Sequence, residues 1–132
     1  MAEKPKISEA EWEVMKIVWA KPASNAKQIV DELGEKKSWN HRTVKTLLSR
    51  LVKKGALSFE TDGNRYLYKA NFEKDDIVQV ESQSFVNRVF DGLALPMLAH
   101  FVSSSKMSQE EIQELKRILE AKEQGGDDDS AD

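Results

Sequence analysis

One segment limits the fold more than any other: residues 40–55 predict an amphipathic helix without a single acidic side chain. Asn40 suits its N-cap, and Gly55 suits the position just past its end. One face is apolar and consists of Val44, Leu47, Leu48, Leu51 and Val52. The opposite face, called the basic face below, consists of Arg42, Lys45, Thr46, Ser49 and Lys53, flanked by Arg50 and Lys54. Long cations among short hydroxyls suit contact with phosphates and base edges in a DNA major groove. The alternative is a solvated surface that is basic by chance.

Two helices are predicted before the basic segment, and a hairpin after it. A capping box at residues 8–11 starts a helix that is apolar around most of its circumference and ends before Pro22. Helical spacing of apolar residues from 26 to 33 predicts a second helix, closed by Gly34. Residues 37–39 could add a short strand. Residues 56–61 and 65–69 alternate as strands do, around the turn signal Asp62-Gly63.

The order of these elements indicates a fold. A helix, a second helix, a basic helix and a hairpin make up a winged helix-turn-helix, in which the third helix enters the groove and the hairpin touches the backbone. We therefore predict a mainly α protein (an α+β winged helix) with a DNA-binding domain over residues 1–72.

Residues 73–124 predict three further helices, which carry more large apolar side chains than so short a unit can bury alone. A matching unit from a second copy would cover them, whereas the alternative is that they fold back on the first domain. The predicted dimer interface consists of Phe85, Val89, Phe90, Leu95, Leu98, Phe101, Ile112, Leu115, Ile118 and Leu119. The acidic residues 125–132 predict a disordered tail.

Charge is distributed unevenly along the chain. Residues 1–70 carry 14 basic and 9 acidic side chains, a net of +5, whereas residues 71–132 carry 6 and 14, a net of −8. The asymmetry favours a polyanionic partner for the first half, although the tail alone supplies four of the negative charges.

Several classes of protein are disfavoured by composition. The chain has no cysteine, which excludes disulfides and thiolate chemistry, and its two histidines lie far apart in the sequence. No apolar run reaches the roughly 18 residues that cross a bilayer, and the N-terminus lacks a signal peptide's apolar stretch. No nucleophile–base pair or phosphate-binding loop is visible. We expect a cytoplasmic protein without a cofactor, a metal or direct membrane insertion, and not an enzyme.

Six stretches of the chain carry a family resemblance: residues 7–15, Trp39, 43–55, 84–89, 98–102 and 108–112. With these stretches the chain resembles the penicillinase and methicillin-resistance repressors of bacteria (BlaI/MecI/CopY type), over about residues 6 to 122. The resemblance implies an N-terminal winged helix and a C-terminal helical dimerisation domain exchanged between protomers. It also implies repression through dyad operators with TACA and TGTA half-sites.

The resemblance carries two signalling routes. In the β-lactam branch, a membrane sensor protease signals the antibiotic, and the repressor is cut in its dimerisation region between an Asn and a Phe. The matching pair here is His100-Phe101, so the first residue of the candidate cleavage site departs from the family pattern. The copper-sensing branch has a cysteine-rich tail, and the absence of cysteine excludes that route.

The leading hypothesis is a homodimeric, sequence-specific repressor whose partner is double-stranded operator DNA. The predicted DNA contacts are Asn40, His41, Arg42, Thr43, Lys45, Thr46, Ser49, Arg50, Lys53, Lys54 and Arg65. One alternative is a protein-interaction adaptor that uses the winged helix for docking, which would display an apolar patch in place of the basic face. Another is a family repressor that answers an unrelated signal.

Overall fold

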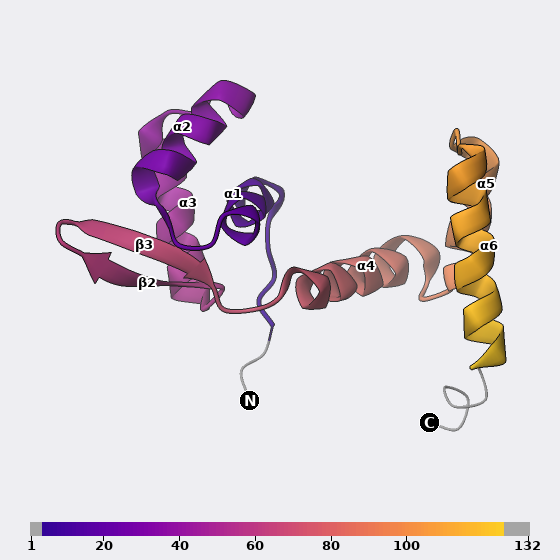
Figure 1. Cartoon of the computed structure of the whole chain (residues 1–132). Coiled ribbons are helices and arrows are strands. Elements are labelled where there is room, and N and C mark those ends of the chain that lie inside the picture. Colours follow the sequence, from indigo (N-terminus) through magenta and orange to yellow (C-terminus); the bar gives the residue numbers. More distant parts are fainter. Residues whose placement is uncertain (1–3, 126–132) are drawn as a thin grey trace. The chain divides into compact units, whose positions relative to one another are not determined.

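The structure, a computed structural model, describes residues 4–125 (Figure 1). This part of the chain divides into two compact units, one up to Phe85 and one from Val86 onward. The elements in chain order are α1 (Glu9–Ala20), β1 (Ser24–Asn25), α2 (Ala26–Lys37), α3 (His41–Lys54), β2 (Leu57–Asp62), β3 (Arg65–Ala70), α4 (Lys74–Phe90), α5 (Ala94–Ser104) and α6 (Gln109–Gln124). The predicted fold class is confirmed.

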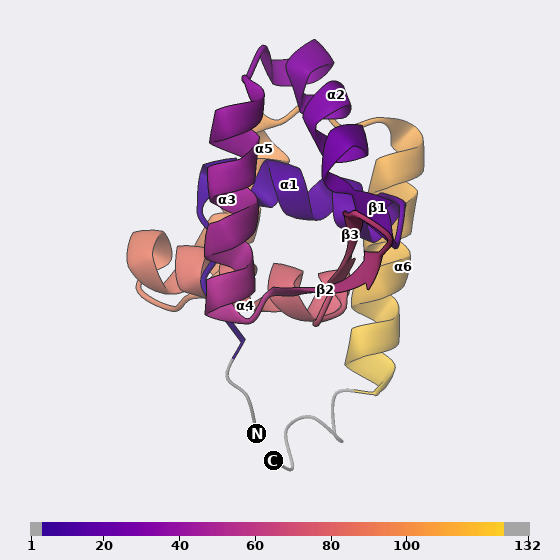
Figure 2. The ribbon, with the colours of Figure 1, turned by 90° about the vertical axis from the view of Figure 1, so that its left-hand side faces the viewer.

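The first unit is built around the faces that α1, α2 and α3 bury against one another. In the view of Figure 2, α1 lies behind α2 and α3. Fully buried side chains from all three helices and from β2 form the core: Val14, Met15, Ile29, Leu33, Val44, Leu48, Leu51 and Leu57. Each large side chain buried in this way stabilises the fold by about 1.5–3 kcal/mol. This core holds α3 by its apolar face and leaves the basic face outside.

The sheet is small and antiparallel, in the order β1-β3-β2. Strands β2 and β3 form the predicted hairpin, with Asp62 opposite Arg65 at the turn and Leu57 opposite Ala70 at the root. In Figure 1 this hairpin, the wing, projects beyond α2 and α3 of the same unit. Gly63 in the turn has φ +65°, a conformation that suits glycine.

Two local predictions are wrong. Gly34 does not close α2, because the helix continues through Glu35, Lys36 and Lys37 to a left-handed C-cap at Ser38 with φ 59°. Good helix formers after Gly34 and basic side chains in the last turn favour this continuation. Residues 37–39 form no strand either. The third strand is β1, two residues long, which pairs Ser24 with Tyr68 and Asn25 with Leu67.

Helix α4 begins in the first unit. Ile77 is fully buried in the core of that unit, whereas Val86 starts the second unit. The compact unit thus extends past the boundary predicted at 72/73. The predicted dimerisation domain over 73–124 stays a prediction, and the predicted tail lies outside the described residues except for Gly125.

The second unit contains the end of α4 together with α5 and α6. Ser108 and Glu111 form the predicted capping box of α6, and Pro96 lies in the first turn of α5. Neither α5 nor α6 has a buried residue. Two amphipathic helices without a buried side chain gain little from tertiary packing, on which most helices in proteins depend.

Candidate nucleic-acid interface

Helix α3 is fixed at both ends by backbone chemistry. At the start, the Asn40 side-chain oxygen accepts a hydrogen bond of 2.9 Å from the Thr43 backbone N–H. At the end, Gly55 takes φ +83°, and its N–H points back to the carbonyls of Leu51 and Val52. The two predicted caps are therefore confirmed. The side-chain oxygen of Asn40 is engaged in the N-cap hydrogen bond.

The structure brings the predicted DNA-contact residues of α3 to the surface. His41, Arg42, Thr43, Lys45, Thr46, Ser49, Arg50 and Lys53 are all exposed, as are Asn40 and Arg65. Among the residues that the structure describes, Arg42, Lys45, Arg50, Lys53 and Arg65 have no ion pair, whereas Lys21, Lys27 and Lys69 pair with Glu32, Asp31 and Glu60. The cations of this surface are thus available to an outside anion.

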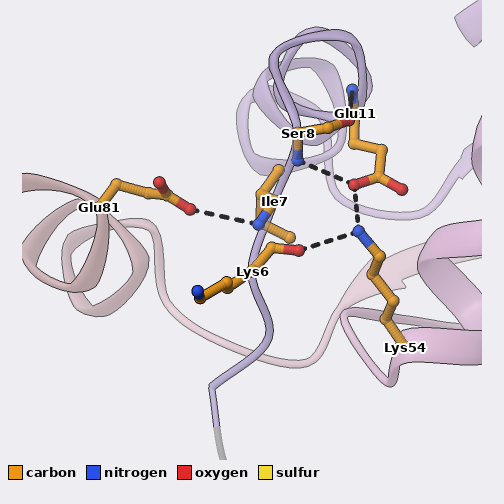
Figure 3. A network of polar contacts seen from close by, with 6 residues as sticks. All are labelled: Lys6, Ile7, Ser8, Glu11, Lys54 and Glu81. Carbon is orange, nitrogen blue, oxygen red and sulfur yellow. Dashed lines mark hydrogen bonds and ion pairs between the residues drawn. The ribbon is translucent and has the colours of Figure 1, made fainter. Parts of the chain in front are cut away.

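Lys54 is different, and the structure gives it another role. Its ammonium donates to the backbone carbonyl of Lys6 at 2.9 Å and pairs with the carboxylate of Glu11 (Figure 3). Glu11 is 1% exposed and also caps α1 by accepting from the Ser8 N–H at 2.9 Å. Burial raises the pKa of Glu11, but the hydrogen bonds and charge of Lys54, together with Ser8, bring it below its ordinary value. Lys54 therefore links the end of α3 to α1 and to the segment before it, and its contact with a phosphate stays a prediction.

The surface beside α3 is hollowed where three elements meet. A hollow of about 440 Å³ is lined by the start of α2, the middle of α3 and the tip of the wing, including Asn25, Lys27, Lys45, Ser49, Asn64, Arg65 and Tyr66. A second hollow of about 390 Å³ shares Lys45 and Ser49 and is lined also by His41, Arg42 and Thr46. The basic face and the wing thus form one concave, cationic surface.

Six residues that line the first hollow were not among the predicted DNA contacts: Asn25, Ala26, Lys27, Asn64, Tyr66 and Tyr68. The alternation of β3 contains one signal, because Tyr66 and Tyr68 must lie on the same face of the strand. Tyr66 is 47% exposed and stacks on Phe59, with ring centroids 4.1 Å apart. Nothing local in the sequence brings the start of α2 to this place, since that position depends on tertiary packing.

The predicted dimer residues are mostly exposed within one chain. Val89, Leu95, Leu98, Phe101, Ile118 and Leu119 are exposed, and Phe85, Phe90, Ile112 and Leu115 are half-buried. Leu95 at 76% is the most exposed of the large apolar side chains. The candidate cleavage site, His100-Phe101, lies inside α5 with both side chains exposed.

Other site types find little support in the described residues. No large apolar side chain of α3 is exposed, so the basic face lacks the apolar patch that an adaptor would display. Residues 4–125 contain no group of three His, Cys, Asp or Glu that could hold a metal ion. No helix within that range is long and apolar enough to span a membrane.

The fold and this surface define a winged helix-turn-helix protein of the class that binds duplex DNA. A family model described as Penicillinase repressor matches residues 7–121. The chain belongs to this family of DNA-binding transcriptional repressors.

Several known repressors and their solved structures are similar to this chain. The penicillinase repressor of Bacillus licheniformis is 40% identical over 116 residues, covering 88% of this chain and 91% of that protein. The methicillin resistance regulatory protein MecI of Staphylococcus aureus (strain N315) is 39% identical over 116 residues, covering 88% and 94%. The solution structure of the DNA binding domain of the repressor BlaI has a TM-score of 0.53 and 38% identity, covering 58% of this chain and 93% of that one. A solution structure of the monomeric form of Bacillus licheniformis BlaI with the blaP half-operator has a TM-score of 0.51, with the same identity and coverage.

Proposed function

We propose that this protein is a transcriptional repressor that inserts α3 into the major groove of a dyad operator and works as a homodimer in the cytoplasm. The observation that carries the proposal is the basic face: Arg42, Lys45 and Lys53 are exposed on one face of α3 and have no ion pair within residues 4–125, whereas Lys21, Lys27 and Lys69 are paired. The related BlaI of Bacillus licheniformis is found in complex with a half-operator, which supports operator DNA as the partner of this chain.

The chemistry of recognition divides between two groups of side chains. Arg42 and Thr46 lie on the groove side of α3, where guanidinium and hydroxyl groups can read base edges. Lys53 and Arg65 lie where phosphates would pass and position the helix without reading sequence. The hollow between α2, α3 and the wing would hold the sugar–phosphate backbone of one DNA strand, with Lys27 and Tyr66 at its edge.

Titration of labelled duplexes tests the proposal. The wild-type protein should prefer a duplex with TACA and TGTA half-sites over a shuffled duplex. Arg42→Ala and Thr46→Ala should each weaken operator binding by about 1–3 kcal/mol and reduce this preference. Lys69→Ala is a matched control, because Lys69 is an exposed wing cation that pairs with Glu60 at 3.3 Å. Wild-type affinity in both α3 variants would contradict the assignment of the basic face.

Dimerisation is supported by the exposed apolar side chains of α5 and α6. We expect the full chain to sediment as a dimer at micromolar concentration and a fragment of residues 1–85 to sediment as a monomer. Leu95→Asp and Phe101→Asp should shift the full chain toward monomer, because a charge at a covered apolar contact must be desolvated. A monomeric wild-type chain would contradict the proposal. Joining two DNA-binding units raises avidity by about 10²–10⁴-fold, so a signal that separates the dimer would release the operator.

The proposed targets are β-lactam resistance genes, and the proposed signal is a cut at His100-Phe101 by a membrane sensor protease system. The names of the penicillinase and methicillin-resistance relatives support this assignment. Because the bond lies within α5, the helix has to open locally before a protease can hold it extended. Expression with a cognate sensor and a β-lactam tests the route by fragment mass. A product ending at His100 supports it, whereas an intact repressor that leaves its operator points to an unrelated signal.

A further inference from the structure

A short N-terminal segment, residues 6–8, connects the end of α3 to α4 within the first unit (Figure 3). The Lys6 carbonyl accepts from the ammonium of Lys54, the last residue of α3. The next residue, Ile7, donates its backbone N–H to a carboxylate oxygen of Glu81 on α4 at 3.2 Å. Adjacent residues of one extended segment therefore contact both helices.

The segment is fixed by packing as well as by hydrogen bonds. Ile7 is 8% exposed and belongs to the core, as does Ile77, which lies one helical turn before Glu81 and is fully buried. Glu11 joins the same network through Ser8 and Lys54. α4 is thus attached to the DNA-binding unit at two successive turns, well beyond the link at residues 71–73.

We propose that residues 6–8 act as a strap that fixes α4 up to Glu81 to the end of the recognition helix. Glu81 is then a positioning residue: it acts on DNA recognition through α4, the helix that leads into the second unit. The consequence rests on the proposed dimer on a dyad operator. A fixed α4 restricts which separations of the two half-sites a pair of protomers can reach, so the strap contributes to the selection of operator spacing.

Hydrogen exchange in the absence of DNA tests the strap itself. In Glu81→Ala, exchange at the Ile7 amide and at the amides of residues 77–85 should accelerate by about two- to tenfold, the equivalent of one ordinary net hydrogen bond. Glu81→Gln keeps an acceptor oxygen and should exchange like the wild type. Gln79→Ala, an exposed position on the same helix, is the second control. Unchanged exchange in Glu81→Ala would overturn the strap.

Operator titration tests its consequence. A series of dyad duplexes with the central spacer changed by one or two base pairs is compared with an isolated half-site. In Glu81→Ala, the preference for the best spacing should fall by about two- to tenfold while half-site affinity stays unchanged. An unchanged spacing preference, or an equal loss on the half-site, would overturn the role in spacing. Failure of the wild type to bind any duplex would instead contradict the proposed function, and the exchange result would still decide the strap.

Discussion

Two adjacent lysines at the end of α3 should have opposite roles. Lys53 is exposed and has no ion pair among residues 4–125, whereas Lys54 is bonded to the Lys6 carbonyl and to the buried carboxylate of Glu11. Lys54→Met removes the cation but keeps the length of the aliphatic stem. It leaves the Glu11 carboxylate, whose side chain is 2% exposed, without its charged partner.

The cost of Lys54→Met follows from these two contacts. Loss of a partly exposed hydrogen bond to a carbonyl costs about 1 kcal/mol, and a buried carboxylate without its cation costs several more. Because the Lys54 side chain is 36% exposed, water can replace part of the interaction, and we expect a total of about 2–4 kcal/mol. In a unit of this size the melting temperature should fall by about 4–8 °C for each kcal/mol.

Lys53→Met should do the reverse. As a surface substitution it should change the unfolding free energy by less than about 0.5 kcal/mol. As the loss of one phosphate contact it should lower the slope of log affinity against log salt by about 0.9. Thermal unfolding and salt-dependent titration of both variants, measured below the melting temperature, separate the two effects. An unchanged melting temperature and a lower salt slope in Lys54→Met would refute the role assigned here.

Three further predictions concern stability. The folded pKa of Glu11 lies below its ordinary value of 4.5, so its stabilising contribution should be present above that pH and be lost as the pH falls through the folded pKa. The difference in unfolding free energy between wild type and Glu11→Gln should therefore shrink below pH 4.5, and a constant difference would contradict this. A fragment of residues 1–85 should be more stable to urea than a fragment of residues 1–72 by about 1.5–3 kcal/mol, since only the longer one buries Ile77, and equal midpoints would refute the attachment of α4. Gly34→Ala should stabilise the protein by about 0.4–1 kcal/mol, because the added Cβ would lie at an ordinary contact distance of 3.8 Å from the Trp39 carbonyl oxygen. Gly55→Ala should destabilise the protein by about 1–2 kcal/mol, because Gly55 has a φ of +83° that strains an L side chain. Thermal melts that rank the two variants in the opposite order would contradict both expectations.

The elements with strong local signals were predictable from the sequence. The capping boxes of α1 and α6 and the caps of α3 depend on side chains that bond the backbone within a few residues. The hairpin depends on a two-residue turn and on alternation. In each case the interactions that form the element lie within the segment, so the local amino-acid sequence is sufficient to predict it.

The features that could not be predicted from the sequence depend on contacts between residues that are distant along the chain. β1 is two residues long and exists because β3 lies beside Ser24 and Asn25. The sequence places Lys54 at the flank of the basic face, and its contacts with Lys6 and Glu11 could not be predicted because the fold brings those distant residues to the end of α3. The burial of Ile77 in the first unit could not be predicted, because the sequence shows it only as one apolar residue of a helix.

The acid-free sequence of α3 carries a local cost that a polyanionic partner would offset. Arg42 and Lys45, and likewise Arg50 and Lys53, stand three residues apart, where like charges disfavour a helix by a few tenths of a kcal/mol for each pair. The cap at Asn40, the turn at Gly55 and the buried face of Val44, Leu47, Leu48 and Leu51 offset that cost. A local rule broken in this way is expected at functional sites. Duplex phosphates supply the negative charge that the helix itself lacks, so operator DNA should stabilise the folded first unit in proportion to its occupancy.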